Sequence, residues 1–205
     1  MHLEILSEQQ KELLPFIALF KREYYMVGGT AIALHIGHRE SIDFDLFKEK
    51  EIRKSDVFSK IYKAKLKYNA SFSQYNQINL EINQVKFTFF QFPYNIPKNS
   101  ELKGIIKMPD LLTLAAMKAF ALGRRSKWKD YVDLYFLIKY HFSAKEIAYK
   151  ADELFKGEFV KKQFMAQIGY FGDINYNEKV TFLVKNPPSE EEIKAFLIDA
   201  SLSDL

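Results

Sequence analysis

The clearest pattern in the chain is an alternation of hydrophobic and acidic residues in the string IDFDL, from Ile42 to Leu46. Successive side chains of a β-strand point to opposite faces, so Ile42, Phe44 and Leu46 share one face. Asp43 and Asp45 then share the other face. Because three large apolar residues line one side, we expect a well-buried strand. Two like charges on such a strand require a partner of opposite charge.

A second short strand, Tyr24–Val27, comes before this one and ends at the pair Gly28-Gly29. Thr30 follows, and it can cap a helix that continues to about Ile36. Glycines between a strand and a helix let backbone N–H groups approach a phosphate, and the helix N-terminus adds a favourable dipole. A tight turn without a ligand would use the same glycines. The functional interpretation therefore depends on the nearby aspartates.

In the rest of the chain, the spacing of hydrophobic residues predicts several helices and one group of three strands. We expect a helix from Ser7 to about Phe20 and a lysine-rich amphipathic helix over residues 51–66. Three β-type runs then form a meander: Tyr68–Gln74, Gln77–Ile82 and Val85–Phe92. After a loop with two prolines, helices are predicted over residues 110–122, 127–140, 143–155, 158–171 and 189–200. This order predicts a mixed α/β half, residues 1–107, followed by an all-helical half, residues 108–205.

Composition narrows the class of protein. Of 205 residues, 48% are hydrophobic and 16% aromatic, which excludes a disordered chain. The absence of cysteine excludes disulfides, thiolate zinc sites and thiol nucleophiles. We expect a cytoplasmic protein without a membrane segment, since neither a signal peptide nor an apolar run of about 18 residues is present. The net charge of +4 permits a polyanionic partner but is weak evidence for one.

The aspartate pair suggests a metal. Carboxylates at Asp43 and Asp45 are close enough to share a hard divalent cation. Mg²⁺ is the natural ion, with Mn²⁺ as the alternative, because it leaves positions open for phosphate and water. His35 and His38 nearby could instead indicate zinc, but the sequence offers no third soft ligand.

The helical half contains a lysine in an apolar setting. Lys118 lies in line with Leu111, Leu114 and Leu122, so its amine must find an anion or extend to solvent. Asp130 is three residues before Asp133 and shares its helix face. One of these acids is a catalytic candidate, and the other can equally be a structural acid paired with a neighbouring arginine or lysine.

Two stretches resemble a known family. The string GGTAIALHIGHRESIDFDLF combines the glycine turn with the aspartate pair, and it is similar to the signature of the polymerase-β-like nucleotidyltransferase superfamily. More narrowly, it resembles the AbiEii/AbiGii toxin family, as does KAFALGRRSKWKDYVDLYFL, from Lys118 to Leu137. The resemblance implies an α/β (α+β) fold, with a mixed sheet and flanking helices followed by a helical domain that completes the active cleft.

The resemblance also implies an activity: Mg²⁺-dependent transfer of a nucleoside monophosphate from a nucleoside triphosphate (NTP) to an acceptor. In some members the acceptor is the 3′ end of tRNA, and the protein is a toxin that stops growth or aborts phage infection. A cognate antitoxin protein would then be a partner.

By position, the resemblance assigns roles to the residues quoted. Asp43 and Asp45 would hold Mg²⁺, Lys118 would neutralise triphosphate charge, and Asp130 would be the base for the acceptor hydroxyl. Gly28, Gly29 and Thr30 would hold triphosphate oxygens, and the further nucleotide-binding positions Arg39 and Ser41 come just ahead of the aspartate pair. Arg125 is a candidate phosphate contact, although it stands at a helix end, where a cation is favourable regardless of function.

One position departs from the superfamily pattern. A third carboxylate usually stands on a later strand, but this chain reads VKFTFF, with Thr88 at that place. Either Asp130 supplies the missing base or the enzyme is attenuated, and we favour the first because the helical motif is intact. Two alternatives stay open: a nucleotide-binding protein with weakened catalysis, and a nucleotidyltransferase that acts on a small molecule.

Overall fold

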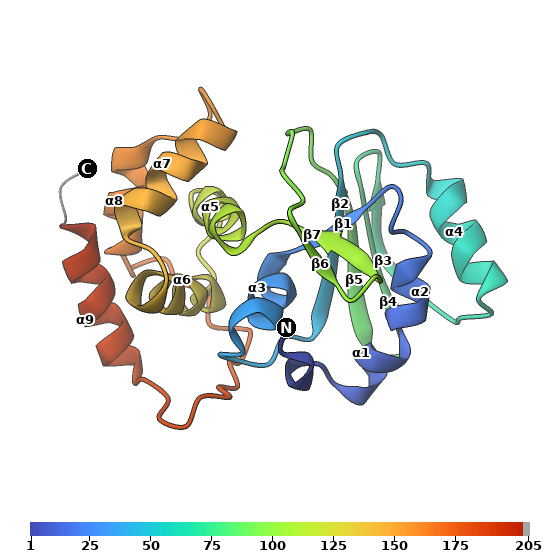
Figure 1. The fold of residues 1–205 in the computed structure, drawn as a ribbon, viewed down its shortest axis with the longest axis horizontal. Helices are drawn as coiled ribbons and strands as arrows, with labels where there is room; N and C mark the ends of the chain where they lie inside the picture. Colours follow the sequence, from blue (N-terminus) through green and yellow to red (C-terminus); the bar gives the residue numbers. More distant parts are fainter. Residues whose placement is uncertain (203–205) are drawn as a thin grey trace. The chain divides into compact units, whose positions relative to one another are not determined.

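A computed structural model describes residues 1–202 of the chain (Figure 1). The chain divides into two compact units, Met1–Asp110 and Leu111–Leu205. The sequence-based boundary, between residues 107 and 108, lies close to this division. No helix in the described part of the chain is long and apolar enough to cross a membrane.

The first unit is built on a five-stranded mixed sheet with the order β1-β2-β5-β4-β3. Its strands are β1 (Tyr25–Val27), β2 (Asp43–Lys48), β3 (Asn69–Gln74), β4 (Gln77–Ile82) and β5 (Val85–Gln91). The antiparallel neighbours β3, β4 and β5 form the predicted meander. β1 is antiparallel to β2, whereas β2 is parallel to β5. The predicted mixed α/β fold class is therefore confirmed.

The alternation along β2 separates an aromatic core from a polar face. Phe44 and Leu46 are fully buried and pair in register with Phe87 and Phe89 of β5. Phe20 packs against this layer, with its ring centroid 4.9 Å from that of Phe89. Asp43 and Asp45 lie on the opposite, half-buried face. The rigid aromatic layer thereby determines which way both carboxylates point.

The expectation that Ile42 belongs to the buried face is wrong. Its side chain is 61% exposed, although Phe44 and Leu46 are 0% exposed. The strand begins at Asp43, so Ile42 precedes the hydrogen-bonded ladder and is not held to its alternation.

The helices of this unit are α1 (Glu8–Glu12), α2 (Leu14–Ala18), α3 (Gly28–Ile36) and α4 (Lys54–Lys63). The single helix predicted from Ser7 to Phe20 is wrong, because the helix is interrupted at Leu13. Pro15 lacks an N–H group and its ring clashes with the preceding turn, so it is accepted only in the first turn of a new helix. Ser7 caps α1 through a capping box with Gln10.

A small hairpin, β6 (Ser100–Leu102) and β7 (Ile106–Met108), lies where the sequence pattern predicts a loop. Its turn passes through Lys103 and Gly104, which have φ values of 43° and 76°. The strands are only three residues long, too short for an alternation to be recognised. β7 contacts β1, so the hairpin extends the wall of the first unit beside that strand.

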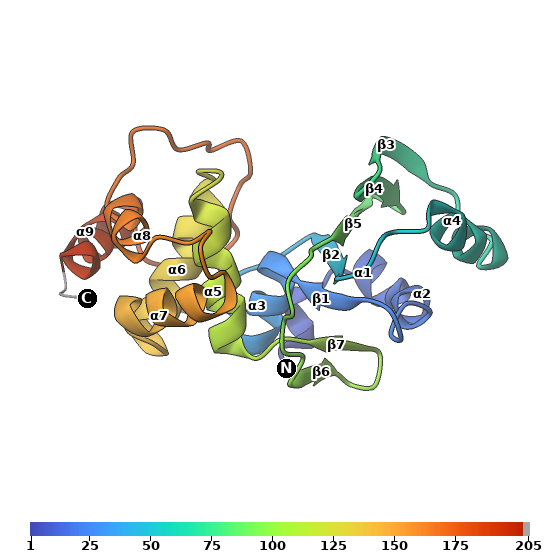
Figure 2. The ribbon, with the colours of Figure 1, turned by 90° about the horizontal axis from the view of Figure 1, so that it is seen from above.

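The regular elements of the second unit are all helices within the described residues, and a long non-helical segment connects the last two of them (Figures 1 and 2). Its helices are α5 (Leu111–Leu122), α6 (Trp128–Tyr140), α7 (Ala144–Leu154), α8 (Lys161–Ile168) and α9 (Glu190–Ser201). Ser143 and Ser189 begin α7 and α9 with capping boxes to Glu146 and Glu192. α5 packs against α6, α7 and α8, which makes it the central helix of this unit.

Candidate active site

The glycine turn lies directly against the aspartate pair. Gly28 has a φ of +76°, which favours glycine because it carries no side chain. A Cβ built on Gly28 would lie 2.0 Å from Asp45 Oδ2, far inside van der Waals contact. Both the backbone conformation and the close approach therefore require glycine. The predicted phosphate-binding turn and the predicted metal-binding carboxylate form one surface.

Arg39 and Ser41 lie over the second glycine. A Cβ on Gly29 would be 2.5 Å from Arg39 Nη2 and 3.5 Å from Ser41 Oγ. Arg39 is only 4% exposed, and its Nη1 donates a hydrogen bond of 2.8 Å to the Glu40 carbonyl. The Arg39 guanidinium group, held by its hydrogen bond to the Glu40 carbonyl, therefore lies beside the glycine turn.

Thr30 connects the turn to the aspartate strand. Its hydroxyl donates to the carbonyl oxygen of Asp43 and shares a 2.8 Å hydrogen bond with Ser41 Oγ. The prediction that Thr30 caps the helix is wrong, since α3 begins at Gly28 and Val27 occupies the cap position. Thr30 is buried within the first turn, where its hydroxyl fixes β2 relative to α3.

The N-terminus of α3 suits an anion. Val27 provides no side-chain hydrogen bond to the first turn of the helix. Backbone N–H groups of a first turn have no partner within their own helix, and the helix dipole favours negative charge there. An incoming phosphate can therefore accept hydrogen bonds at Gly28, Gly29 and Thr30.

The position of the missing third acid is adjacent to the site. Thr88 of β5 is the register partner of Asp45, and Lys86 is the partner of Asp43. Glu81, the other acid on this part of the sheet, pairs with Lys86 from β4. β5 separates it from β2, so Glu81 lies about two strand spacings, roughly 10 Å, from Asp43.

The donor set of the first unit fits Mg²⁺ but not zinc. Among residues 1–202, no group of three or more histidine, cysteine, aspartate or glutamate side chains is placed to hold a metal ion. Zinc sites rely on three or four such ligands. Mg²⁺ commonly uses one or two carboxylates and completes its shell with water and substrate phosphates. Asp43 and Asp45, next to a phosphate-binding turn, match that arrangement.

The second unit contains a buried ion cluster. Lys118 of α5 is 4% exposed, and both Asp130 and Asp133 of α6 are 0% exposed. Lys118 Nζ lies 2.6 Å from Asp130 Oδ1 and 2.9 Å from Asp133 Oδ2. The sequence left open whether this lysine finds an anion or reaches solvent, and the structure shows that it finds two.

Asp130 is held as a carboxylate. Burial alone raises the pKa of its side chain, but the charges of Lys118 and Arg125 outweigh burial and set the pKa below its ordinary value. Arg125 Nε donates to Asp130 Oδ2 at 3.1 Å. Both oxygens of the expected base therefore accept hydrogen bonds from cations of the same unit.

The predicted site residues thus fall into two groups. The first unit brings together Gly28, Gly29, Thr30, Arg39, Ser41, Asp43 and Asp45. The second unit brings together Lys118, Arg125 and Asp130, and adds Asp133 as an equal partner of the lysine. Lys86 was not singled out from the sequence. Its signal is the parallel register of β2 and β5, which local sequence does not reveal.

Comparisons with known proteins agree with this geometry. The family described as "Nucleotidyl transferase AbiEii toxin, Type IV TA system" matches residues 16–203. An uncharacterised protein of Aquifex aeolicus (strain VF5) is 32% identical over 148 residues, which are 66% of this chain and 68% of that protein.

Two solved structures share the fold at low sequence identity. The nucleotidyltransferase toxin MenT4 of Mycobacterium tuberculosis superposes with a TM-score of 0.63 at 11% identity, over 95% of this chain and 82% of MenT4. JHP933 of Helicobacter pylori superposes with a TM-score of 0.56 at 16% identity, over 96% and 91% of the two chains. Because the family match spans the glycine turn, the aspartate pair and the lysine cluster, this chain belongs to the AbiEii toxin family and is a nucleotidyltransferase.

Proposed function

We propose that the protein transfers a nucleoside monophosphate from an NTP to RNA, with the 3′ end of tRNA as the first candidate acceptor, in a Mg²⁺-dependent reaction. In this role it is the toxin of a toxin–antitoxin pair, with a cognate antitoxin as its partner. The observation that carries the proposal is the contact between the glycine turn and Asp45, where a Cβ on Gly28 would lie 2.0 Å from the carboxylate oxygen. A phosphate bound at the turn is therefore next to a carboxylate able to hold a metal.

The residues of the first unit bind and orient the triphosphate. Backbone N–H groups of Gly28, Gly29 and Thr30 donate to its phosphate oxygens. Arg39, next to Gly29, adds positive charge at the same turn. Positioning and charge stabilisation account for most of the catalysis of phosphoryl-type transfers, since little covalent chemistry is required of the protein.

Asp43 and Asp45 are the residues that would hold Mg²⁺. The ion, when bound, neutralises phosphate charge and lowers the pKa of a coordinated hydroxyl. Thr30 supports this pair by bonding to the Asp43 carbonyl, and the buried Phe44 keeps both carboxylates on one face.

We propose that Asp130 positions Lys118 and Arg125, to which it is bonded, and does not act as the expected base. A base must reach the acceptor hydroxyl, but Asp130 is 0% exposed and both its oxygens are bonded to Lys118 and Arg125. Its lowered pKa also makes it a weak proton acceptor. The expected roles of Lys118, which would neutralise triphosphate charge, and of Arg125, which would contact phosphate, stay predictions.

A transfer assay tests the proposal. The protein is incubated with each α-labelled NTP, Mg²⁺ and total RNA, and labelled products are resolved by size. We expect label on RNA of tRNA size with the unaltered chain and none with Asp45→Asn, which keeps the shape of the side chain but not its charge. Glu81→Gln is the matched control, since it removes a carboxylate from the same sheet at a position separated from β2 by β5.

The outcomes separate the alternatives. Full RNA labelling by Asp45→Asn would contradict the assignment. Label only on a small molecule added as acceptor would move the substrate class from RNA to that compound. Expression in cells with and without a neighbouring gene product tests the toxin role: we expect growth arrest with the unaltered chain, none with Asp45→Asn, and rescue by the antitoxin.

A further inference from the structure

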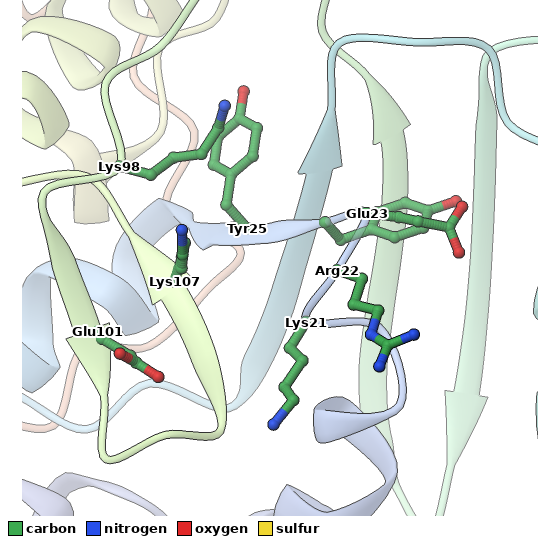
Figure 3. A pocket seen from close by; sticks show the side chains of 8 residues that line it. Lys21, Arg22, Glu23, Tyr25, Lys98, Glu101 and Lys107 are labelled. Carbon is green, nitrogen blue, oxygen red and sulfur yellow. The ribbon is translucent and has the colours of Figure 1, made fainter.

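A pocket of about 530 Å³ opens at the start of β1, and every residue that lines it belongs to the first unit (Figure 3). One wall is the loop after α2, with Lys21 and Arg22. The other wall is formed by the β6–β7 hairpin and the segment before it, with Lys98 and Lys107. Small-ligand pockets commonly measure about 300–1,000 Å³, so this one can hold a group of nucleotide size.

The pocket is separate from the nucleotide site. None of the glycines and aspartates of the candidate active site lines it. Tyr25, which does line it, precedes Gly28 by three residues along β1, a separation of about 10 Å at the rise of a β-strand. A ligand that extends beyond the active site along this strand can therefore reach the pocket.

The charge of the pocket is strongly positive. The side chains of Lys21, Arg22, Lys98 and Lys107 make no ion pair or hydrogen bond within residues 1–202. Glu23 also lines the pocket, but its carboxylate is already bonded to Lys48 and Lys60 from outside it, at 3.2 Å each. Glu101 is the remaining acid of the lining. The lining of the pocket thus carries four cations and one uncommitted carboxylate, a balance of charge that favours an anion.

A buried hydroxyl independently indicates a ligand. Tyr25 is 2% exposed, and its hydroxyl oxygen is buried without a hydrogen-bond partner among residues 1–202. Figure 3 shows its ring pointing from β1 toward Lys98, with the hydroxyl beside the ammonium group, whose Nζ lies 5.1 Å from the ring centroid. Buried polar groups are normally satisfied, so this one is available for an oxygen that the protein does not supply.

The protonation state of this hydroxyl suits a donor. Burial raises the pKa of Tyr25, and the nearby charge of Glu49 raises it further. The hydroxyl therefore keeps its proton at neutral pH. A phosphate oxygen can accept from it while Lys98 and Lys107 neutralise the phosphate charge.

We propose that this pocket binds a phosphodiester group of the RNA acceptor, as a second phosphate site beside the nucleotide site. The inference rests on the proposed function, since it assigns the pocket to the backbone of the same substrate. Exposed cations on two facing walls suit a backbone that passes between them better than a single enclosed phosphate ion.

Binding of a short fluorescent RNA that carries a 3′-phosphate tests the proposal, because this end cannot accept a nucleotide and no NTP is present. Fluorescence anisotropy is measured across a range of salt concentrations with the 205-residue chain. The variants are the pair Lys98→Met with Lys107→Met, and Tyr25→Phe alone. Lys145→Met, which removes an exposed lysine on α7 of the second unit, is the control for loss of a lysine outside the pocket.

We expect the double lysine variant to bind RNA at least about tenfold more weakly at low salt. Its plot of log Kd against log salt should be shallower by about 0.7 for each phosphate that the variant no longer neutralises. Tyr25→Phe removes no charge, so it should weaken binding with an unchanged salt slope. It should leave the melting temperature unchanged or raise it, since the hydroxyl has no partner to lose. Lys145→Met should bind as the unaltered chain does.

Unchanged affinity and salt slope in the double variant would overturn the proposal. So would a result in which inorganic phosphate stabilises the unaltered chain but not the variants while RNA binding is equal in all of them, because the pocket would then take free phosphate. A failure of the proposed function is distinguishable. In that case the unaltered chain labels no RNA with a free 3′ end, although binding of the blocked RNA can still be measured.

Discussion

Asp45 of β2 and Thr88 of β5 are direct neighbours across the parallel strand pair. The residue that stands where the superfamily usually carries its third carboxylate therefore lies beside a predicted metal ligand, on the same face of the sheet. A hydroxyl in place of that acid leaves the site with one negative charge and one candidate metal ligand fewer. The site of this chain has two carboxylates, and an added acid at Thr88 could join them without a change of fold.

Thr88→Asp should make the protein more dependent on Mg²⁺. Without metal, the added charge opposite Asp45 costs about 0.2–1 kcal/mol, because like charges on paired strands repel. With Mg²⁺ the three acids share a cation, so the melting temperature should rise more than that of the unaltered chain. Thermal melts with and without Mg²⁺ measure this, with Thr88→Asn as the uncharged control. Equal Mg²⁺ responses in the two variants would contradict the placement of the metal.

Gly28→Ala should abolish transfer beyond its effect on folding. Gly28 and Gly157 both have positive φ, +76° and +81°, so an alanine costs about 1–2 kcal/mol of stability at either position. A Cβ at Gly157 meets nothing within 4 Å, whereas at Gly28 it displaces Asp45. We expect a larger loss in urea unfolding for Gly28→Ala than for Gly157→Ala, because only the first adds the clash with Asp45, and loss of transfer activity only in Gly28→Ala. Comparable activity in both variants would show that the contact with Asp45 is unimportant.

Thr30→Val should weaken both stability and activity. It leaves the Asp43 carbonyl and Ser41 hydroxyl without their shared partner, at a cost of about 1–3 kcal/mol for buried groups. The aspartate strand then loses a link to α3, so transfer should fall as well. Thr30→Ser retains the hydroxyl and should recover most of both properties. Denaturant unfolding and the transfer assay provide the measurements, and equal behaviour of the two variants would count against the bridging role.

Breaking a buried ion pair costs about 3–5 kcal/mol when it leaves a buried charge uncompensated. In Asp130→Asn the Lys118 amine keeps Asp133 as a partner, so this variant should lose less than that amount of stability. The pKa of Asp130 is lowered in the folded state, so its stabilising contribution is complete above the unfolded value, near 3.8, and is lost as the pH falls through the folded value. The stability gap between the unaltered chain and the variant should be constant near neutral pH and shrink below about pH 4.

Urea unfolding across this pH range measures the gap. Glu178→Gln serves as a comparison, because Glu178 pairs with Lys127 and Lys129 but its side chain is 38% exposed. We expect it to lose no more than about 1 kcal/mol, as surface pairs do. A gap for Asp130→Asn that widens in acid would contradict the charged state of the cluster.

Several features of this protein follow from sequence alone because they depend on residues a few positions apart. The capping boxes at Ser143 and Ser189 need only a serine and a glutamate three residues later. β4 has the predicted bounds, Gln77–Ile82, because polar turns flank an alternating run. The glycine turn and the aspartate pair lie within one short stretch, so both can be recognised without knowledge of how the strands pair.

Tertiary structure decided the features that join distant segments. The parallel register places Thr88 beside Asp45, and the packing of α5 on α6 gives Lys118 two aspartates in place of solvent. Ile42 is a case in which local sequence misled. The alternating pattern predicted a buried side chain, but the strand begins one residue later and Ile42 is exposed. Local sequence sets which conformations a segment prefers. Register, burial and the partners of a charge depend on the free energy of packing between segments, which is determined only when the whole unit folds.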